Sequence, residues 1–344
     1  MVVKYALRRL SLLLFMLFTL TLFTFSLNYL FPGELVTNFS GEMNSSYAQT
    51  QELIAKYRIE DNILVQYLAF MTRMFEGDWG LSLSSGQPVL DHVKLFFPAT
   101  LELCLYALSV SVIVGVPGGI IASAYYKKWP DRVINSLSLM GFSIPVFWLA
   151  LLLIMAFCLG LGWFPMSGRI GLLYEIQPLT NLLLLDIYLQ GFPYGGAAFW
   201  DAVHHLALPT IVLAMYPTTV LIRFTRDSML EVLEQNYIKT ARAKGLNRSQ
   251  LIVHHALRNA LLPVIKQIGL QFSTLITLAM ITEVIFSWPG IGRWLIDSIY
   301  QRDYPAIQGG LLAVSFFVII ANMLADTIHS ALDPLARNQA HGKV

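Results

Sequence analysis

Charged side chains are scarce in this sequence, because Asp, Glu, Lys and Arg together make up only 13% of its 344 residues. Soluble domains carry about 25% charged residues. Hydrophobic residues reach 56%, so the composition excludes an ordinary soluble domain and predicts an integral membrane protein. The net charge of +2 gives no sign of a nucleic-acid partner, and we expect none.

Cysteine and catalytic motifs are also sparse. The two cysteines, Cys104 and Cys158, both lie in apolar stretches and are typical of small buried hydrophobes rather than of a disulfide framework. No Gly-x4-Gly-Lys-Ser/Thr loop occurs, and no Cys/His cluster has zinc spacing. The pairs His204-His205 and His254-His255 are adjacent, and helical neighbours point about 100° apart. We therefore predict no metal site, no catalytic residue and no cofactor in this chain.

Long apolar stretches fill most of the sequence. Residues 10–33 contain no charge over 24 positions, and a spanning helix needs about 20. A cleaved signal peptide has an apolar region of about 7–15 residues and a small-residue site, so we expect an uncleaved first helix. In all we predict six spans, at 10–33, 97–125, 133–168, 202–222, between Lys266 and Arg293, and at 304–325.

Three regions between the spans need separate treatment. Residues 34–94 are polar and predict a small extramembrane region with one helix near 49–75. The charge-free stretch 133–168 is too long for one helix and contains Pro145, so we expect it to span and then re-enter the interface. Residues 179–189 are apolar but short and interrupted by Asp186, which favours an interfacial segment within 176–190 over a membrane-inserted one.

The distribution of Lys and Arg predicts the orientation. With the N-terminus inside, 16 of the 23 basic residues fall at the cytoplasmic ends of the six spans. Cytoplasmic loops of membrane proteins carry such an excess. Both termini are therefore expected in the cytoplasm.

The most basic loop holds the stretch on which a functional prediction can be built, residues 236–246. Its alanines favour helix, and Gly245 suits the left-handed residue that ends one. Lys239, Arg242 and Lys244 suit the negative end of a helix dipole. We predict a short cationic helix outside the bilayer that seats in a cleft of a soluble partner. A solvated basic loop is equally compatible with this stretch alone.

Four acids lie within or beside the predicted spans: Glu102, Glu283, Asp297 and Asp326. An ionisable group at membrane depth is costly and normally faces the bundle interior or water. One interpretation is a proton relay or cation site. The other, which we favour for each acid, is a helix-end carboxylate in a polar network.

Several motifs resemble those of the dipeptide/oligopeptide ABC transporter permeases. They include Arg223-x2-Arg226 followed by Tyr237-Ile-Lys-Thr-Ala-Arg-Ala-Lys-Gly-Leu246, and His255-Ala-Leu-Arg-Asn-Ala-Leu-Leu-Pro263. Phe286-Ser-Trp-Pro-Gly-Ile-Gly292 and Phe97-Pro-Ala-Thr-Leu-Glu102 extend the likeness. Phe142-Ser-Ile-Pro-Val-Phe-Trp-Leu149, Leu161-Gly-Trp-Phe-Pro-Met-Ser-Gly168 and Leu278-Ala-Met-Ile-Thr-Glu283 are similar to the B-type permeases of the Sap (sensitivity to antimicrobial peptides) branch.

The resemblance implies an all-α integral membrane fold of the type I ABC importer permease kind, with six transmembrane helices and a coupling helix at 237–245 between spans 4 and 5. It implies an N-terminal transmembrane helix at 1–33, a periplasmic region at 34–94, a permease domain at 95–335 and a cytoplasmic tail at 336–344. The ATPase-coupling residues would be Tyr237, Lys239, Thr240, Ala241, Arg242, Ala243, Lys244 and Gly245. Glu102 and Glu283 are candidates for the substrate path.

The family's coupling motif has Glu-Ala-Ala-x3-Gly, whereas Lys239-Thr240-Ala241 precede Gly245 here. Leu262-Pro263 also arrives later than in the general spacing. These departures are usual in the peptide branch, but they weaken the transfer of any single contact position.

The function implied is that of a non-catalytic permease in the bacterial inner membrane. Its expected partners are membrane lipid, a second permease, two ATPases that use ATP and Mg, and a periplasmic binding protein. Its expected substrates are peptides, including cationic antimicrobial peptides, or polyamines, and putrescine export is an alternative to peptide import. Rival hypotheses are a proton-coupled secondary transporter, for which the sequence shows no internal repeat, and a non-transporting scaffold.

Overall fold

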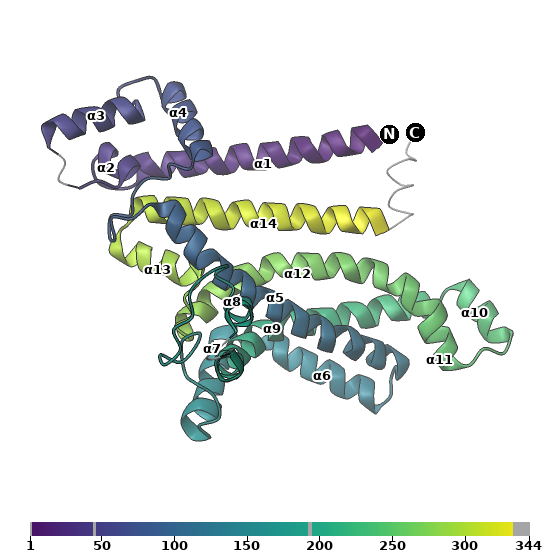
Figure 1. Ribbon diagram of the computed structural model, residues 1–344. Coiled ribbons are helices and arrows are strands. Elements are labelled where there is room, and N and C mark those ends of the chain that lie inside the picture. The colour runs from purple at the N-terminus through teal and green to yellow at the C-terminus, as the bar shows by residue number, and fades with distance from the viewer. Residues whose placement is uncertain (1, 44–45, 192–194, 333–344) are drawn as a thin grey trace. The chain divides into compact units, whose positions relative to one another are not determined.

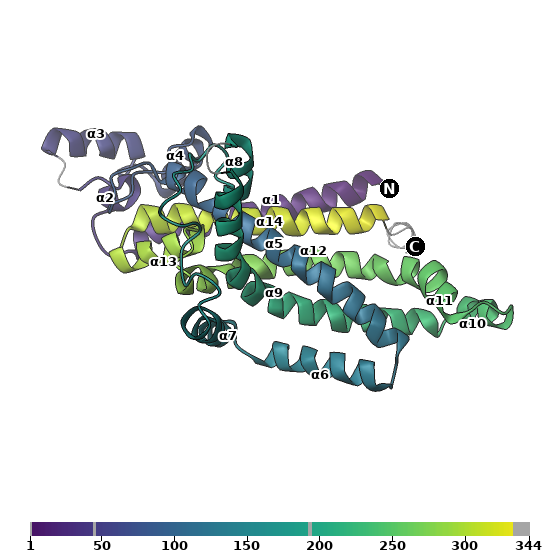
Figure 2. The ribbon, with the colours of Figure 1, turned by 60° about the horizontal axis from the view of Figure 1, so that its bottom comes forward.

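The computed structural model describes residues 2–43, 46–191 and 195–332, and within them it is helical, with one isolated β-bridge between Leu81 and Pro88. The chain divides into two compact units (Figures 1 and 2). Unit 1 comprises Met1–Thr100, Pro178–Leu182 and Pro289–Ile320, and unit 2 comprises Leu101–Gln177, Leu183–Trp288 and Ala321–Val344. Each unit is described by itself.

Unit 1 contains the helices that begin and end the chain. Its elements are α1 (Val2–Leu30), α2 (Leu35–Ser40), α3 (Tyr47–Tyr57), α4 (Ile63–Glu76), the start of α5 (Val89–Ala124), α13 (Ile291–Gln301) and most of α14 (Tyr304–Leu332). An aromatic cluster of Phe25, Phe39, Tyr57 and Phe70 holds α1 to α4 together. Asp303 caps α14 by accepting the Ala306 N–H at 3.2 Å.

The polar region 34–94 has more helices than the sequence analysis expected. Instead of one helix near 49–75, α3 and α4 are separated at Arg58, which has φ +53°. Asn62 then caps α4 by accepting the Leu64 N–H at 3.1 Å. The single-helix prediction was wrong because α3 ends at an arginine with a left-handed backbone conformation. Unlike glycine at such a position, arginine does not indicate a helix end in the sequence.

Unit 2 is a helical bundle around α9 (Gly195–Leu233), which packs against α6 (Trp129–Ser143), α7 (Val146–Leu153) and α12 (Leu257–Ile285). The remaining elements are π-helix η1 (Ile154–Gly160), α8 (Leu183–Gln190), α10 (Asn236–Ala243), α11 (Arg248–Gln250) and π-helix η2 (Leu251–Ala256). Figures 1 and 2 both place α10 and α11 beyond the ends of α9 and α12.

The contact between α5 and α9 depends on glycine. A Cβ on Gly115 would lie 2.8 Å from the Leu221 Cβ, and one on Gly119 would lie 2.6 Å from the Ile222 carbonyl oxygen. The Gly-x3-Gly pair therefore brings the two backbones together, as such pairs do in membrane helices.

Five helices among the described residues are long and apolar enough to cross a membrane: Ser11–Leu30, Val89–Ala124, Gly195–Leu233, Arg248–Ile285 and Tyr304–Thr327. A sixth arises if Trp129–Ser143 and Val146–Gly160, which meet at 101°, count as one broken span. The break lies at Pro145, which cannot continue a helix with normal hydrogen bonding. The six-span count remains a prediction. Of the residues 133–168, those up to Gly160 belong to the two helices of this bent pair, and 161–168 are not helical.

Candidate functional site

The predicted cationic helix is present as α10, and its C-terminal end is set by glycine. α10 runs Asn236–Ala243, so it starts one residue before and ends two residues before the predicted range 237–245. Gly245 has φ +86°, and its N–H donates to the Arg242 carbonyl at 3.0 Å. The Leu246 N–H donates to the Ala241 carbonyl at 3.4 Å. This pair of bonds is the Schellman arrangement, in which a left-handed glycine ends the helix.

One side chain anchors α10 to the bundle. Ile238 is fully buried, and it packs in a cluster formed by the end of α9, by η2 and by the start of α12. Tyr237 is tied to α12 by the Asn259 Nδ2, which donates to its hydroxyl at 2.7 Å. The same end of α9 is joined to α12 by Ser228, whose Oγ donates to the Ala260 carbonyl at 2.8 Å. α10 is thus fixed to two long helices on its inner side.

The outer side of α10 is left uncovered within unit 2. The exposed residues include all three basic residues of the stretch. The exposed predicted coupling residues are Tyr237, Lys239, Thr240, Arg242, Ala243, Lys244 and Gly245. Ala241 is half-buried against the cluster around Ile238. The two alanines of the stretch are divided between the two sides of the helix, because Ala243 is exposed. The uncovered side therefore combines cations with the small residues Ala243 and Gly245.

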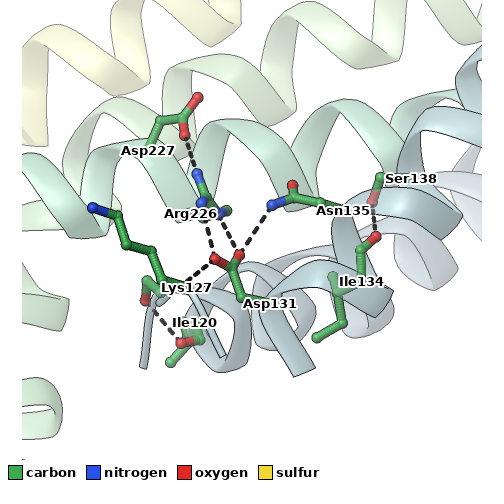
Figure 3. A network of polar contacts seen from close by, with 9 residues as sticks. Ile120, Lys127, Asp131, Ile134, Asn135, Ser138, Arg226 and Asp227 are labelled. Carbon is green, nitrogen blue, oxygen red and sulfur yellow. Dashed lines mark hydrogen bonds and ion pairs between the residues drawn. The ribbon is translucent and has the colours of Figure 1, made fainter. Parts of the chain in front are cut away.

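Close to α10 along α9, a buried ion pair joins α9 to α6 (Figure 3). Arg226 donates from Nε to Asp131 Oδ1 at 2.7 Å and from Nη2 to Asp131 Oδ2 at 3.1 Å. Asp131 also accepts the Lys127 N–H at 2.8 Å and the Asn135 Nδ2 at 3.0 Å. Asp131 is buried, and every contact on it comes from a donor, so the carboxylate is held as an anion.

Sequence reasoning identified Arg226 only as part of a family motif and gave Asp131 no role. A weak signal exists, because Asp131 follows Pro130 in the first turn of a helix, where acids are favoured. Nothing in the sequence indicates that its partner lies 95 residues away.

Glu102, which is one of the predicted substrate-path residues, lies on α5, and its carboxylate caps the N-terminal end of α8. It forms an ion pair with Arg169 and accepts the N–H groups of Leu183 at 3.2 Å and Leu184 at 3.1 Å. Arg169 also lies over the ring of Trp288, 5.5 Å from its centroid. These contacts correspond to the helix-end interpretation. A role of Glu102 in the substrate path stays a prediction.

The other acids are spread over different elements. Glu283 is fully buried on α12, and its backbone carbonyl accepts the Trp288 N–H at 2.8 Å. Asp297 lies on α13, 3.7 Å from Arg293. Within the part of the chain that the structure describes, no group of three or more His, Cys, Asp or Glu residues could hold a metal ion. The path role of Glu283 also stays a prediction.

A long-helix bundle with several candidate spans defines a multi-pass helical membrane protein, and comparison with known proteins identifies its kind. Residues 115–338 match the family described as "Binding-protein-dependent transport system inner membrane component". The chain belongs to this family of inner-membrane transport permeases.

Full-length relatives carry specific names. "Peptide transport system permease protein SapB" of Salmonella typhimurium strain LT2 is 42% identical over 335 residues, covering 97% of this chain and 98% of that protein. "Putrescine export system permease protein SapB" of Escherichia coli K12 has the same identity and coverage. "Di/tripeptide transport system permease protein DppB" of Pseudomonas aeruginosa is 43% identical over 332 residues, covering 96% and 98%.

A solved structure shows the same fold. The MetNI methionine ABC transporter in an inward-facing conformation matches with a TM-score of 0.50 at 15% sequence identity, covering 77% of this chain and 98% of that one. At this identity the match supports the fold and no more.

Proposed function

We propose that this chain is a transmembrane permease subunit of an ABC transporter that moves peptides or polyamines across the bacterial inner membrane. Separate ATPase subunits supply the energy, and α10 is the contact through which they act. The observation that carries this proposal is the geometry of α10, which is anchored by Ile238 and presents an uncovered cationic face. A solvated loop would need neither the buried anchor nor the defined helix end.

The attachment of α10 suits the transmission of a displacement. Its Schellman end, its buried isoleucine and the Tyr237–Asn259 hydrogen bond fix it to α9 and α12. α9 has 39 residues, which corresponds to roughly 58 Å at 1.5 Å per residue. A bilayer core is about 30 Å thick, so α9 extends well beyond it and links α10 directly to the membrane-spanning part.

The names of the relatives support the substrate and partner classes. Two of them are named for peptide transport and one for putrescine export, so peptides, cationic antimicrobial peptides and polyamines are the proposed substrates. The family description names a binding-protein-dependent system. We therefore propose a second permease, two ATPases and a periplasmic binding protein as partners. The excess of basic residues on the α10 side supports cytoplasmic termini.

The proposal is tested at Gly245. Proline at this position cannot adopt φ +86° and lacks the N–H that bonds Arg242. In the transporter reconstituted with its co-expressed subunits, Gly245→Pro should abolish substrate-stimulated ATPase activity while the subunit still inserts. Single cysteines at Lys239 and Lys244 should crosslink to an ATPase subunit.

A matched control exists at the end of α8, which like α10 has eight residues. Gly191 has φ +63°, donates its N–H to the Ile187 carbonyl at 3.2 Å and would have no atom within 4 Å of an added Cβ. Gly245 has the same open surroundings. Gly191→Pro should therefore disturb a helix end without loss of coupling. Intact coupling in Gly245→Pro, together with cysteines that never crosslink to an ATPase, would contradict the proposal.

A further inference from the structure

Helix α4 of unit 1 has its polar residues inside and its apolar residues outside. Gln66 and Arg73 are buried, with 6% and 7% of their surfaces exposed. The outward residues Leu64, Leu68 and Phe75 are 69%, 64% and 84% exposed. Together with Met71 they follow the spacing i, i+4, i+7 and i+11, which forms one stripe on a helix. A helix in water has the opposite arrangement.

Of the inward polar groups of α4, Gln66 is hydrogen-bonded within the protein, whereas Arg73 packs on a ring and its buried Nε and Nη2 have no hydrogen-bond partner among the described residues. Gln66 Nε2 donates to the carbonyls of Ile59 and Asp61, both at 2.8 Å, and the Tyr29 hydroxyl donates to its Oε1. The Arg73 guanidinium lies 3.8 Å from the centroid of the Tyr57 ring. On the outward side, the exposed polar residues of α4 are Thr72, whose hydroxyl donates to the Leu68 carbonyl at 3.0 Å, and Glu76, which ends the helix. Nothing on the stripe requires water.

The position of α4 along α1 gives its depth. Tyr67 reaches Thr21, with 2.8 Å between the two hydroxyl oxygens, and its ring lies 6.1 Å from that of Phe18. Gln66 reaches Tyr29. These contacts lie between about 1.5 Å from Leu30, at Tyr29, and about 18 Å from it, at Phe18, at 1.5 Å per residue, so their midpoint is roughly 10 Å from Leu30. Ser11–Leu30 is a candidate span, and an interfacial helix buries its apolar face by about 5–10 Å.

Two apolar grooves flank α4 on either side of Tyr67. One has a volume of about 640 Å³ and includes Leu22 and Leu64 in its lining, and the other has about 660 Å³ and includes Met71 and Phe316. Each is of a size to take the flexible chain of a small apolar ligand.

We infer that α4 is an interfacial helix embedded in the leaflet at the Leu30 end of α1, with lipid acyl chains covering its Leu64–Leu68–Phe75 stripe and filling the two grooves. The stripe is continuous with the exposed apolar residues of α1, such as Phe18 and Leu22, which face lipid in a spanning helix. This goes beyond the proposed transport function and does not depend on it.

Site-directed spin labelling tests the inference. Single cysteines would replace Leu68 and Phe75 in a Cys104→Ala/Cys158→Ala background, in the transporter assembled with its co-expressed subunits and reconstituted in phosphatidylethanolamine/phosphatidylglycerol vesicles. Leu22→Cys on α1 is the lipid reference, and Glu52→Cys, exposed on α3, is the aqueous reference. Nitroxide relaxation by O2 and by a nickel chelate would be measured at each site.

The expected result is that the labels at 68 and 75 match the label at 22, with O2 accessibility several times that of the nickel chelate. Nickel accessibility equal to that at position 52 would place the stripe in water and overturn the inference. Low accessibility to both reagents would mean that a protein partner covers the stripe, which would overturn it as well.

Discussion

Two helices of this permease, α10 and α4, each leave one face uncovered, and the two faces have opposite chemistry. α10 exposes Lys239, Arg242 and Lys244 and buries an isoleucine. α4 exposes leucines and a phenylalanine and buries Gln66 and an arginine. The chemistry of each uncovered face is the basis on which we propose a soluble protein partner for α10 and acyl chains for α4.

The two helices also differ in what supports them. α10 depends on one aliphatic anchor and on α9 and α12, and α9 is in turn joined to α6 by the Asp131–Arg226 ion pair. α4 depends on aromatic packing of Phe70 and Tyr67 against α1, and on buried polar groups. Three predictions follow this contrast from the largest expected effect to the smallest.

The largest effect is expected at the ion pair that supports the α10 end of unit 2. Arg226→Met leaves the Asp131 carboxylate buried without its cation, and breaking such pairs costs about 3–5 kcal/mol. SDS-induced unfolding in mixed micelles, followed by circular dichroism, measures the loss. The label environments on α4 should not change, because only the α10 side depends on this pair.

The control for this prediction is Asp227→Asn. Asp227 also contacts Arg226, at 3.1 Å, but its side chain is 71% exposed, so its loss should cost at most about 1 kcal/mol. The double variant Asp131→Leu/Arg226→Met should recover most of the stability, since apolar replacement of a buried pair is often neutral. A single Arg226→Met variant as stable as wild type would show that α10 does not depend on this pair.

Matched truncations on the two helices should give an intermediate effect on one and little on the other. Ile238→Ala empties a fully buried position on α10 and should cost about 2–5 kcal/mol. Leu68→Ala removes an exposed side chain on α4 and should change stability by about 0.5 kcal/mol. The same unfolding assay compares them. Equal losses would mean that protein covers both positions, and the contrast between the helices would fail.

The smallest effect is expected on the aqueous side of the α3–α4 region, at the 2.9 Å ion pair of Lys56 and Asp78. Burial raises the pKa of Asp78, but the hydrogen bond and charge of Lys56 outweigh it and hold this pKa below its ordinary 3.8. The hydrogen bond to Asp78 outweighs burial and raises the pKa of Lys56 above 10.5. The pair is partly exposed, so Lys56→Met should cost less than about 1 kcal/mol.

The pH dependence of this stability loss follows from the directions of the two pKa shifts. The contribution of Asp78 is complete above its ordinary pKa and disappears as pH falls through the lowered value. That of Lys56 is complete below 10.5 and disappears as pH rises through the raised value. The difference between wild type and Lys56→Met should therefore be constant between these limits and vanish in acid. A difference that persists fully in acid would show that the pair is not its cause.

The sequence predicted those features that depend on neighbouring residues. α10 and its glycine end were predicted within two residues, because alanine content and a left-handed glycine are local signals. Gly115 and Gly119 permit a close helix contact because they are small, but only the structure identifies α9 as the partner. The thiols of Cys104 and Cys158 are free, as expected from their apolar surroundings.

The features that the sequence did not predict are of two kinds. Some are contacts between residues far apart in the sequence, and the other is a helix that buries its polar side chains and exposes its apolar ones. Asp131 meets Arg226 across 95 residues and Glu102 meets Arg169 across 67, and neither pair is visible before the helices are placed. α4 lies in the region 34–94 that was predicted to be extramembrane from its polar composition, and nothing in the sequence shows that Arg73 and Gln66 are buried.

The glycine contact between α5 and α9 limits how many parts of unit 2 can shift independently. With Gly119 against the Ile222 carbonyl, and with the Ser111 hydroxyl donating to the Ala214 carbonyl at 3.1 Å, the two backbones leave no layer of side chains to slide over. We therefore expect α5 and α9 to move together as one rigid body. Any rotation delivered to one of these helices turns the other through the same angle.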